Sequence, residues 1–230
     1  YKTQYIFHAA AYKHVNILEE NLFSAVKNNI LATVSVLNSI KNSDINMTLI
    51  STDKAVSPKN VLGITKRASE IITLSKSKDF HFKKTNLSVV RFGNVFGSSG
   101  SAIEIFKNQI QKNSPITLTD TKMTRYFMSI REACNLVLQS SQLKYSNSIY
   151  VLNMGKPIKI LDIVKSLIDE KKKIEPSYSS EIKVIGLQKG EKMNEELTIR
   201  KKTNKTKNID ISLAQDPKYS DDKIETLLND

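Results

Sequence analysis

The sequence has one cysteine, few glycines and no long apolar run. A single cysteine, Cys134, among 230 residues allows no internal disulfide, so we expect a reducing compartment and a cytoplasmic location. No apolar run approaches the roughly 20 residues that a transmembrane helix needs, and no signal peptide opens the sequence. These absences predict a chain without a membrane span. The helical setting of Cys134 favours a buried structural thiol over a nucleophile.

The glycine-rich turn that opens a dinucleotide-binding fold is also absent. Such a fold begins with a strand, a glycine-rich turn and a helix, but the first glycine here is Gly63. The run G-N-V-F-G-S-S-G at 93–100 follows a predicted strand and precedes a predicted helix. Its spacing is not G-x-G-x-x-G, and no strand ending in an acidic residue follows about 20 residues later to hold a ribose. We therefore interpret this run as a substrate-side loop and expect a sheet truncated on its N-terminal side.

The net charge of +12 raises the hypothesis of nucleic-acid binding. The lysines are scattered, however, with only small clusters at 171–173 and 201–207. The sequence also lacks zinc-finger cysteines and the aromatic signature of RNA-recognition domains. A solvated basic surface is therefore the preferred interpretation, although the charge also suits an anionic metabolite. We expect no nucleic-acid partner and no metal site.

Alternating strands and helices predict an α/β fold. The hydrophobic fraction of 40% is enough for a core and excludes global disorder. Short apolar runs at 5–11, 48–50 and 87–92 predict buried strands, and apolar residues at helical spacing predict helices over 20–40 and 60–77. Strands that alternate with helices favour a parallel, Rossmann-like sheet with helices on its faces.

The pattern changes after Gly93, where shorter elements predict a smaller α+β lobe. We expect helices over 102–111, 130–142 and 160–171, and strands over 115–119, 148–153 and 181–185. The predicted organisation is a sheet domain with the catalytic residues over 1–92, a substrate-binding region interleaved with the last sheet elements over 93–200, and a polar C-terminal extension over 201–230. We expect that extension to pack loosely and to end in a short helix.

The stretch from Ser51 to Lys66 carries the strongest chemical signal. The apolar run at 48–50 ends in a hydroxyl, a carboxylate and an amine, which belong to Thr52, Asp53 and Lys54. A second amine, that of Lys66, follows in a predicted helix. Such groups at the carboxyl end of a strand form a plausible acid–base site in an open α/β sheet. The alternative is a surface turn with solvated charges, because a Ser-Pro pair follows the cluster.

Six sequence motifs occur in a fixed order along the chain. They are H-A-A-A-Y-K-H-V at 8–15, S-T-D-K-A-V at 51–56, R-F-G-N-V-F-G-S-S-G-S at 91–101, M-T-R-Y-F-M at 123–128, V-L-N-M-G-K-P at 151–157 and G-L-Q-K-G-E-K at 186–192. Together they resemble the CapD-like polysaccharide biosynthesis proteins, which are extended short-chain dehydrogenase/reductases that include the UDP-N-acetylglucosamine 4,6-dehydratases. The resemblance runs from about residue 5 to residue 197.

The resemblance implies an NAD-dependent lyase that acts on a UDP-N-acetylhexosamine, with UDP-N-acetylglucosamine as the expected substrate. The product would be a 4-keto-6-deoxy sugar nucleotide. In family terms Thr52 holds the oxygen at sugar carbon 4, Asp53 acts as the acid and Lys54 as the base. Lys66 would hold the nicotinamide ribose and favour a deprotonated partner through its charge.

The resemblance also implies two sets of binding residues. The residues expected to line the NAD site are His8, Ala9, Ala10, Ala11, Lys13, Asn29 and Lys66. The residues expected to meet the sugar nucleotide are Asn94, Ser98, Ser99, Ser101, Arg125 and Glu191, with Arg125 paired to a phosphate. For His8 the alternative is a strand-end histidine satisfied by backbone, and for Arg125 it is a surface salt bridge.

Two positions depart from the commonest family patterns. Leu62 stands four residues before Lys66, where the usual short-chain dehydrogenase signature has a tyrosine. An apolar residue there points to the configuration-retaining branch, whose full-length members are anchored in the inner membrane. Gln188 and Lys189 stand where the family often has Arg-Pro, which weakens the expectation that this loop grips a diphosphate.

Two other functions remain open at this point. One is a truncated chain without catalysis of its own, either a remnant or a subunit that complements an N-terminal fragment, because the first predicted strand would otherwise be an exposed edge. The other is a related nucleotide-sugar epimerase or reductase. A homo-oligomer is a further expectation that the resemblance implies.

Overall fold

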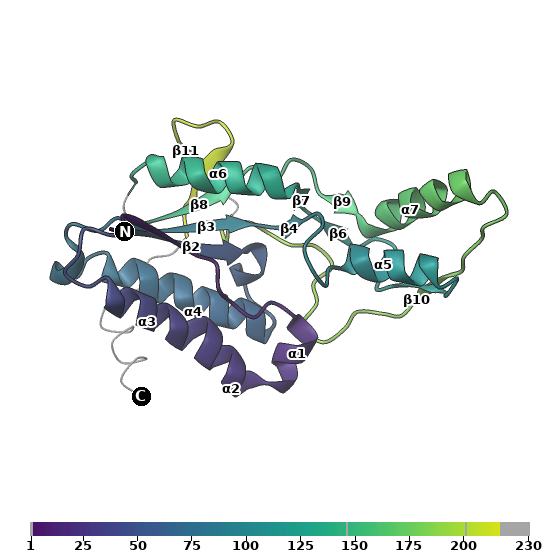
Figure 1. Ribbon diagram of the computed structural model, residues 1–230, viewed down its shortest axis with the longest axis horizontal. Coiled ribbons are helices and arrows are strands. Elements are labelled where there is room, and N and C mark those ends of the chain that lie inside the picture. Colours follow the sequence, from purple (N-terminus) through teal and green to yellow (C-terminus); the bar gives the residue numbers. More distant parts are fainter. Residues whose placement is uncertain (1, 146, 201, 217–230) are drawn as a thin grey trace. The chain divides into compact units, whose positions relative to one another are not determined.

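The computed structural model describes residues 2–145, 147–200 and 202–216 (Figure 1). These residues form two compact units. The first unit comprises the described parts of Tyr1–Phe92, Cys134–Asn153 and Glu196–Asp230, and the second comprises Gly93–Ala133 and Met154–Glu195. The chain thus leaves the first unit at Phe92 and returns to it twice.

The first unit is built on a six-stranded sheet whose first four strands are parallel. The strands, in spatial order, are β1 (Tyr5–His8), β2 (Asn46–Thr52), β3 (Leu87–Phe92), β8 (Ser148–Leu152), β12 (Ile211–Ala214) and β11 (Thr203–Lys205). The last two run antiparallel to their neighbours. This arrangement confirms the predicted Rossmann-like α/β fold.

Helices cover both faces of this sheet (Figure 1). One face carries α3 (Ala32–Ser39) and α4 (Val61–Lys76), and the other carries the part of α6 (Ile130–Gln142) from Cys134 onward. The N-terminus of α4 is capped by Asn60, whose Oδ1 accepts a hydrogen bond from the N–H of Gly63 at 2.7 Å. This cap fixes where α4 begins beside the end of β2.

The helix predicted over 20–40 is confirmed from Leu22 to Ser39. It runs through α2 (Leu22–Ala25), a π-helical segment η1 (Val26–Leu31) and α3, and the junction residues Val26 and Ala32 keep helical backbone angles. A separate short helix, α1 (Val15–Glu20), precedes it and ends at Asn21, whose backbone is not helical. A π-helical turn is rare and occurs frequently at functional sites. Short 3₁₀ turns complete the unit at η2 (Asp53–Ala55) and η3 (Phe80–Phe82).

The core of the first unit lies between the sheet and the helices α3 and α4. Its buried side chains come from alternate strand positions and from the inner helix faces, and include Leu37, Met47, Leu49, Ile72, Leu87 and Val89. Burying one such side chain contributes about 1.5–3 kcal/mol. The core therefore holds β2 and α4 rigidly, and these two elements carry the predicted acid–base residues.

The polar C-terminal region forms two strands, β11 and β12, which its composition did not predict. β12 pairs antiparallel with β8, with Ile211 opposite Leu152, and Ile211 is 1% exposed. The expectation of a loosely packed extension from residue 201 is therefore wrong for β11 and β12, which extend the main sheet. The predicted terminal helix lies outside the described residues.

The second unit is a small α+β lobe, as predicted. Its helices are α5 (Ala102–Gln111) and α7 (Ile160–Ile174). Three strand pairs accompany them: β5 (Ile116–Leu118) with β10 (Ile182–Val184), β4 (Asn94–Val95) with β7 (Phe127–Met128), and β6 (Thr124–Arg125) with β9 (Ile158–Lys159). Phe106, Ile116 and Val164 are among the side chains that form its core.

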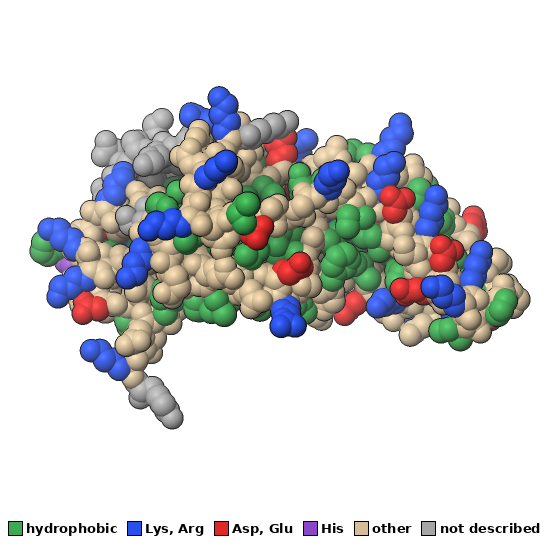
Figure 2. Space-filling model, turned by 90° about the horizontal axis from the view of Figure 1, so that it is seen from above, with side chains coloured by type: hydrophobic (Ala, Val, Ile, Leu, Met, Phe, Trp, Pro, Cys, Tyr) green, Lys and Arg blue, Asp and Glu red, His purple; other side chains and the backbone are tan. Residues whose placement is uncertain are grey.

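Charged side chains are scattered rather than gathered on the face drawn in Figure 2. On the face drawn in Figure 2, lysine and arginine side chains are dispersed, with acidic side chains between them. No described helix is both long enough and apolar enough to cross a membrane. Cys134 is exposed on α6, so the expectation of a buried thiol is wrong. Among the described residues, no group of three or more His, Cys, Asp and Glu side chains is arranged to hold a metal ion.

Candidate active site

The end of β2 presents a compact cluster of polar groups. The hydroxyl of Thr52 donates to Asp53 Oδ1 at 2.9 Å, and Lys54 Nζ lies 3.0 Å from the same oxygen. Asp53 is fully buried, whereas the Lys54 side chain is 19% exposed. A fully buried carboxylate is not the solvated surface charge of the alternative interpretation. The cluster is an acid, an amine and a hydroxyl at the carboxyl end of a parallel strand.

The second carboxylate oxygen of Asp53 carries the most informative feature of this cluster. Oδ2 is buried and has no hydrogen-bond partner among the described residues. Buried polar atoms are almost always hydrogen-bonded, and an exception calls for an explanation. A proton or a ligand hydroxyl at Oδ2 would satisfy it. The proton-transfer role predicted for Asp53 remains a prediction, and the unpartnered Oδ2 is the observation that bears on it.

Helix α4 approaches this cluster closely because of a glycine. A methyl group at Gly63 would collide with the carbonyl oxygen of Lys54 and lie 3.0 Å from Cβ of Pro58. Only glycine lets the first turn of α4 pack directly on the turn after β2. Lys66 follows Gly63 on the same helix, so this packing fixes the distance between α4 and the Asp53 cluster.

Lys66 is a buried amine with a perturbed pKa. It is 5% exposed, and burial lowers its pKa from 10.5 to about 8, although the nearby charge of Glu70 opposes the shift. His8, at the end of β1, is also buried, and its Nε2 lies 3.1 Å from the hydroxyl of Thr33. Burial and the charge of Lys66 lower the pKa of His8. His8 is therefore neutral at pH 7 and is satisfied by a side chain rather than by backbone.

Asn29 ties together the segments around the predicted NAD site. It lies in η1 and is 1% exposed. Its Oδ1 accepts from the N–H of Tyr12 at 2.8 Å, while Nδ2 donates to the carbonyl of Tyr12 and to Thr65 Oγ1, both at 3.1 Å. These bonds hold the loop after β1 against α4, one residue from Lys66. Asn29 is thus a positioning residue in this structure.

The loop that Asn29 holds contains the small residues predicted to approach a cofactor. Ala9, Ala10 and Lys13 are exposed and Ala11 is half-buried. Small exposed side chains at a strand end leave the backbone open to a ligand. By contrast, Leu62 is buried in an apolar cluster with Leu18 and Ala25 and offers no proton chemistry.

The residues predicted to bind the sugar nucleotide all lie in the second unit. Ser101 caps α5, and its hydroxyl accepts from the N–H of Glu104 at 3.5 Å. Asn94 and Ser98 are half-buried, and Ser99 is exposed. Glu191 closes a turn, because its carboxylate accepts from the N–H of Gln188 at 3.0 Å. Ligand contacts of these residues remain a prediction.

Arg125 has a structural role that the sequence did not indicate. Its guanidinium donates to the carbonyls of Thr124 at 2.7 Å, Met193 at 3.0 Å and Lys192 at 2.8 Å. The side chain is buried. Arg125 therefore anchors the G-E-K loop to β6, and it is not the surface salt bridge considered as the alternative.

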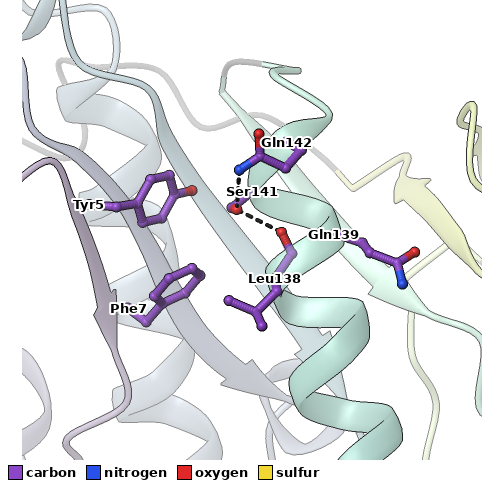
Figure 3. Close-up of a pocket in the computed structure, with 6 residues that line it drawn as sticks. All are labelled: Tyr5, Phe7, Leu138, Gln139, Ser141 and Gln142. Carbon is purple, nitrogen blue, oxygen red and sulfur yellow. Dashed lines mark hydrogen bonds between the residues drawn. The ribbon is translucent and has the colours of Figure 1, made fainter.

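A separate cavity of about 380 Å³ lies between β1 and α6 (Figure 3). Its lining consists of Tyr5, Phe7, Leu138, Gln139, Ser141 and Gln142. The rings of Tyr5 and Phe7 are stacked at 4.7 Å and point toward α6. Tyr5 pairs with Asn46 at the first residue of β2, whereas Thr52 is the last. The cavity therefore lies toward the opposite end of the sheet from the Asp53 cluster.

Sequence reasoning missed a group of buried charged residues beside the cluster. These residues are Arg67, Glu70, Arg91 and Asp216, and Ser51 is bonded to Glu70. One signal was available: Arg91 is the only charged residue in the apolar run 87–92. A charge within a buried strand requires a buried partner.

Comparison with known proteins identifies the same family as the six motifs. The family model described as "Polysaccharide biosynthesis protein" matches residues 1–216. The capsular polysaccharide biosynthesis protein CapD of Staphylococcus aureus is 47% identical over 198 residues, which is 86% of this chain and 32% of that protein. A UDP-glucose 4-epimerase of Rickettsia canadensis is 36% identical over 194 residues, which is 84% of this chain and 55% of that protein.

The fold also matches solved structures. Pen from Bacillus thuringiensis has a TM-score of 0.82 at 30% identity, and the match covers 99% of this chain and 75% of that one. Several structures of this fold, all below 25% identity, are complexes with NAD. The chain spans about a third of the length of CapD. Its motifs, its fold and the family model together show that the chain belongs to the CapD-like polysaccharide biosynthesis proteins of the extended short-chain dehydrogenase/reductase family.

Proposed function

We propose that this chain is the catalytic and substrate-binding part of a nucleotide-sugar 4,6-dehydratase that acts on a UDP-N-acetylhexosamine, with UDP-N-acetylglucosamine as the first candidate. The observation that carries the proposal is the buried, unpartnered Oδ2 of Asp53, with Lys54 and Thr52 bonded to the other oxygen. A dehydratase needs an acid for the departing hydroxyl and a base for a carbon-bound proton within one small site.

Each residue of the cluster has a role that its contacts support. Thr52 would orient the hydroxyl at sugar carbon 4, because its own hydroxyl lies at the strand end beside Asp53. Asp53 would give a proton to the hydroxyl that leaves carbon 6, from the oxygen without a partner. Lys54 would take the proton from carbon 5. Together these two transfers release one water molecule.

NAD is the cofactor that this proposal requires, and the residues around Lys66 fit it. The exposed alanines after β1 leave room beside the backbone, and Lys66 contributes a buried amine from α4. Lys66 would bond the nicotinamide ribose, and Asn29 would keep the loop in place. Bound NAD supplies reversible hydride acceptance. Structures of this fold that contain NAD support the assignment.

The test is incubation of the chain with NAD and UDP-N-acetylglucosamine, followed by detection of a 4-keto product. Asp53→Asn keeps the shape of the side chain but removes the acid, so we expect turnover to fall by about 10²–10⁴-fold. Lys54→Ala should abolish turnover as well. Lys59→Ala, a nearby lysine outside the cluster, is the control. Unchanged turnover in the first two variants would refute the assigned roles.

A UDP-sugar 4-epimerase is the second candidate, because the Rickettsia canadensis relative bears that name at 36% identity. Both reactions begin with oxidation at carbon 4, but an epimerase releases no water. Leu62 disfavours the epimerase, since no tyrosine stands four residues before Lys66. Mass spectrometry of the product separates the two: a loss of one water supports the dehydratase, and an isomer of unchanged mass supports the epimerase.

The edge strand β1 is a candidate surface for pairing with a further strand. Among the described residues β1 pairs only with β2, and Phe7 beside the edge is 38% exposed. An unpaired strand edge is normally paired or covered, so we infer that a further parallel strand pairs here, carried by an N-terminal fragment with the glycine-rich turn that this sequence lacks. NAD binding that appears only when such a fragment is added would support this inference. A dimer in light scattering that becomes a monomer when the fragment is added would instead indicate a second copy at this edge.

A further inference from the structure

A buried cluster of four charged side chains lies next to the candidate active site without a role in the proposed chemistry. Glu70 on α4 and Arg91 on β3 are both fully buried. Arg91 donates to Glu70 through Nε to Oε1 at 2.7 Å and through Nη2 to Oε2 at 2.6 Å. Arg67 Nη1 donates to the same Oε2 at 2.9 Å. Such two-point arginine–carboxylate pairs are strong and fix orientation.

Asp216 completes the cluster from a distant part of the chain. It follows β12, and its Oδ2 lies 2.6 Å from Arg91 Nη1 and 3.3 Å from Arg67 Nη1. Its Oδ1 accepts from the N–H of Ile199 at 3.1 Å. Two arginines and two acids give no net formal charge. Burial alone would lower the pKa of Arg91, but the hydrogen bonds and charges of Glu70 and Asp216 outweigh it and raise that pKa.

The cluster is linked to the candidate active site through Ser51 and through the helix that carries Lys66. The hydroxyl of Ser51 donates to Glu70 Oε1 at 2.5 Å, and Ser51 pairs in register with Arg91 across β2 and β3. Ser51 directly precedes Thr52. On the other side, Glu70 lies one helical turn after Lys66. The same carboxylate therefore joins the strand that ends in the acid–base residues to the helix that carries the buried amine.

We propose that this cluster positions the candidate active site: Glu70 and Arg91 lock the end of β2 to α4, and Asp216 ties the C-terminal strand pair to the same point. The side chains of all four residues are buried, so we assign them as positioning residues. Misplacing a reacting group by about 1 Å costs on the order of 10²-fold in rate. The consequence for turnover rests on the proposed function, whereas the effect on the geometry of the site does not.

The location of the cluster distinguishes positioning from simple stabilisation. Buried ion pairs can often be replaced by apolar residues of similar volume without loss of stability. Stability alone therefore does not require four buried charges between Ser51 and Lys66. A network whose directional bonds join Ser51 on β2, Arg91 on β3 and Glu70 on α4 holds its members to one geometry, which apolar packing does less strictly.

Amide hydrogen exchange on the full chain tests the proposal without cofactor or sugar. The variants are Asp216→Asn and Ser51→Ala, and Asp44→Asn is the control because that side chain is 75% exposed. The reporting amides are those of Lys54, which donates to Thr52 Oγ1, and Val56, which donates to the carbonyl of Asp53. Their exchange is compared with that of core strand β3.

In both variants we expect the amides of Lys54 and Val56 to exchange about tenfold faster than in wild type, after correction for any change in the β3 amides. In Asp44→Asn we expect neither the turn amides nor the β3 amides to change. If the turn and the core change in step, the cluster serves stability alone and the proposal is wrong. Should Asp216→Asn fail to fold, Ser51→Ala decides the question by itself, because it removes one hydroxyl and leaves every charge in place.

Turnover, where the wild-type chain has it, supplies an independent readout. Asp216→Asn should lower kcat about 10–100-fold with little change in KM, and Asp216→Glu should restore part of the loss. A fall that appears in KM alone would contradict positioning of the reacting groups. A wild-type chain without turnover would count against the proposed function, while the exchange experiment would still decide the positioning claim.

Discussion

Replacing Lys66 by methionine should stabilise the protein while destroying its active site. Methionine has a similar length and volume and carries no charge. Glu70 would keep Arg67 and Arg91 as partners, so the change leaves no buried acid unpaired. The variant therefore removes the cost of holding an ammonium group in the protein interior and little else.

The expected gain in the free energy of unfolding follows from the pKa of Lys66, which burial lowers from 10.5 to about 8. Each pKa unit corresponds to about 1.4 kcal/mol, so the charged form costs about 3 kcal/mol at pH 7. The unfolded chain binds the proton more tightly, so wild-type stability rises as pH increases between about 8 and 10.5. We expect Lys66→Met to be about 3 kcal/mol more stable than wild type at pH 7 and about 1 kcal/mol more stable at pH 9.5.

Urea unfolding of both proteins at the two pH values measures this difference. Lys84→Met is the matched control, because the Lys84 side chain is 81% exposed, and it should change stability little at either pH. NAD binding and any turnover should be lost in Lys66→Met alone. A variant that is less stable than wild type at pH 7, or a difference that does not shrink with pH, would refute the reasoning.

Three further changes test the packing around the site. Gly63→Ala should lower the free energy of unfolding by about 1–3 kcal/mol in urea unfolding and loosen the turn at Lys54, because the new methyl group meets backbone; an unchanged stability would contradict the close approach. Asn29→Ala should cost about 1–3 kcal/mol and expose the loop at Tyr12 to protease, and a protected loop would show that Asn29 does not hold it. Ile211→Ala should lower the thermal midpoint through a loss of about 2–5 kcal/mol if β12 is integral to the sheet, whereas no shift would indicate a dispensable extension.

The parts of the fold that sequence could predict are those set by local periodicity. The strand predicted over 48–50 is the centre of β2, and the helix predicted over 60–77 is α4 to within one residue at each end. Both signals are local, because a continuous apolar run or apolar residues at helical spacing lie within the segment itself. The position of Asp53 at a strand end was predicted for the same reason.

The parts that sequence could not predict depend on contacts between distant residues. Asp216 meets Arg91 only because β12 returns to the sheet, and the polar composition around it gave no sign of a strand. The carbonyl contacts of Arg125 depend on a loop far along the chain. Cys134 lies on the outer face of α6, which a pattern of apolar neighbours did not reveal. For Asp216 and Arg125 the decisive partner is remote in sequence.

The most direct test of the central claim is the reaction in deuterated water, with NAD and UDP-N-acetylglucosamine, followed by mass spectrometry. The chain is used alone and together with an N-terminal fragment that carries a glycine-rich turn. If the Asp53 cluster removes the proton from carbon 5 and water leaves, the product is lighter by one water and carries one solvent deuteron at carbon 5. Asp53→Asn should give no such product. A product of unchanged mass without deuterium, or no product under either condition, would contradict the account.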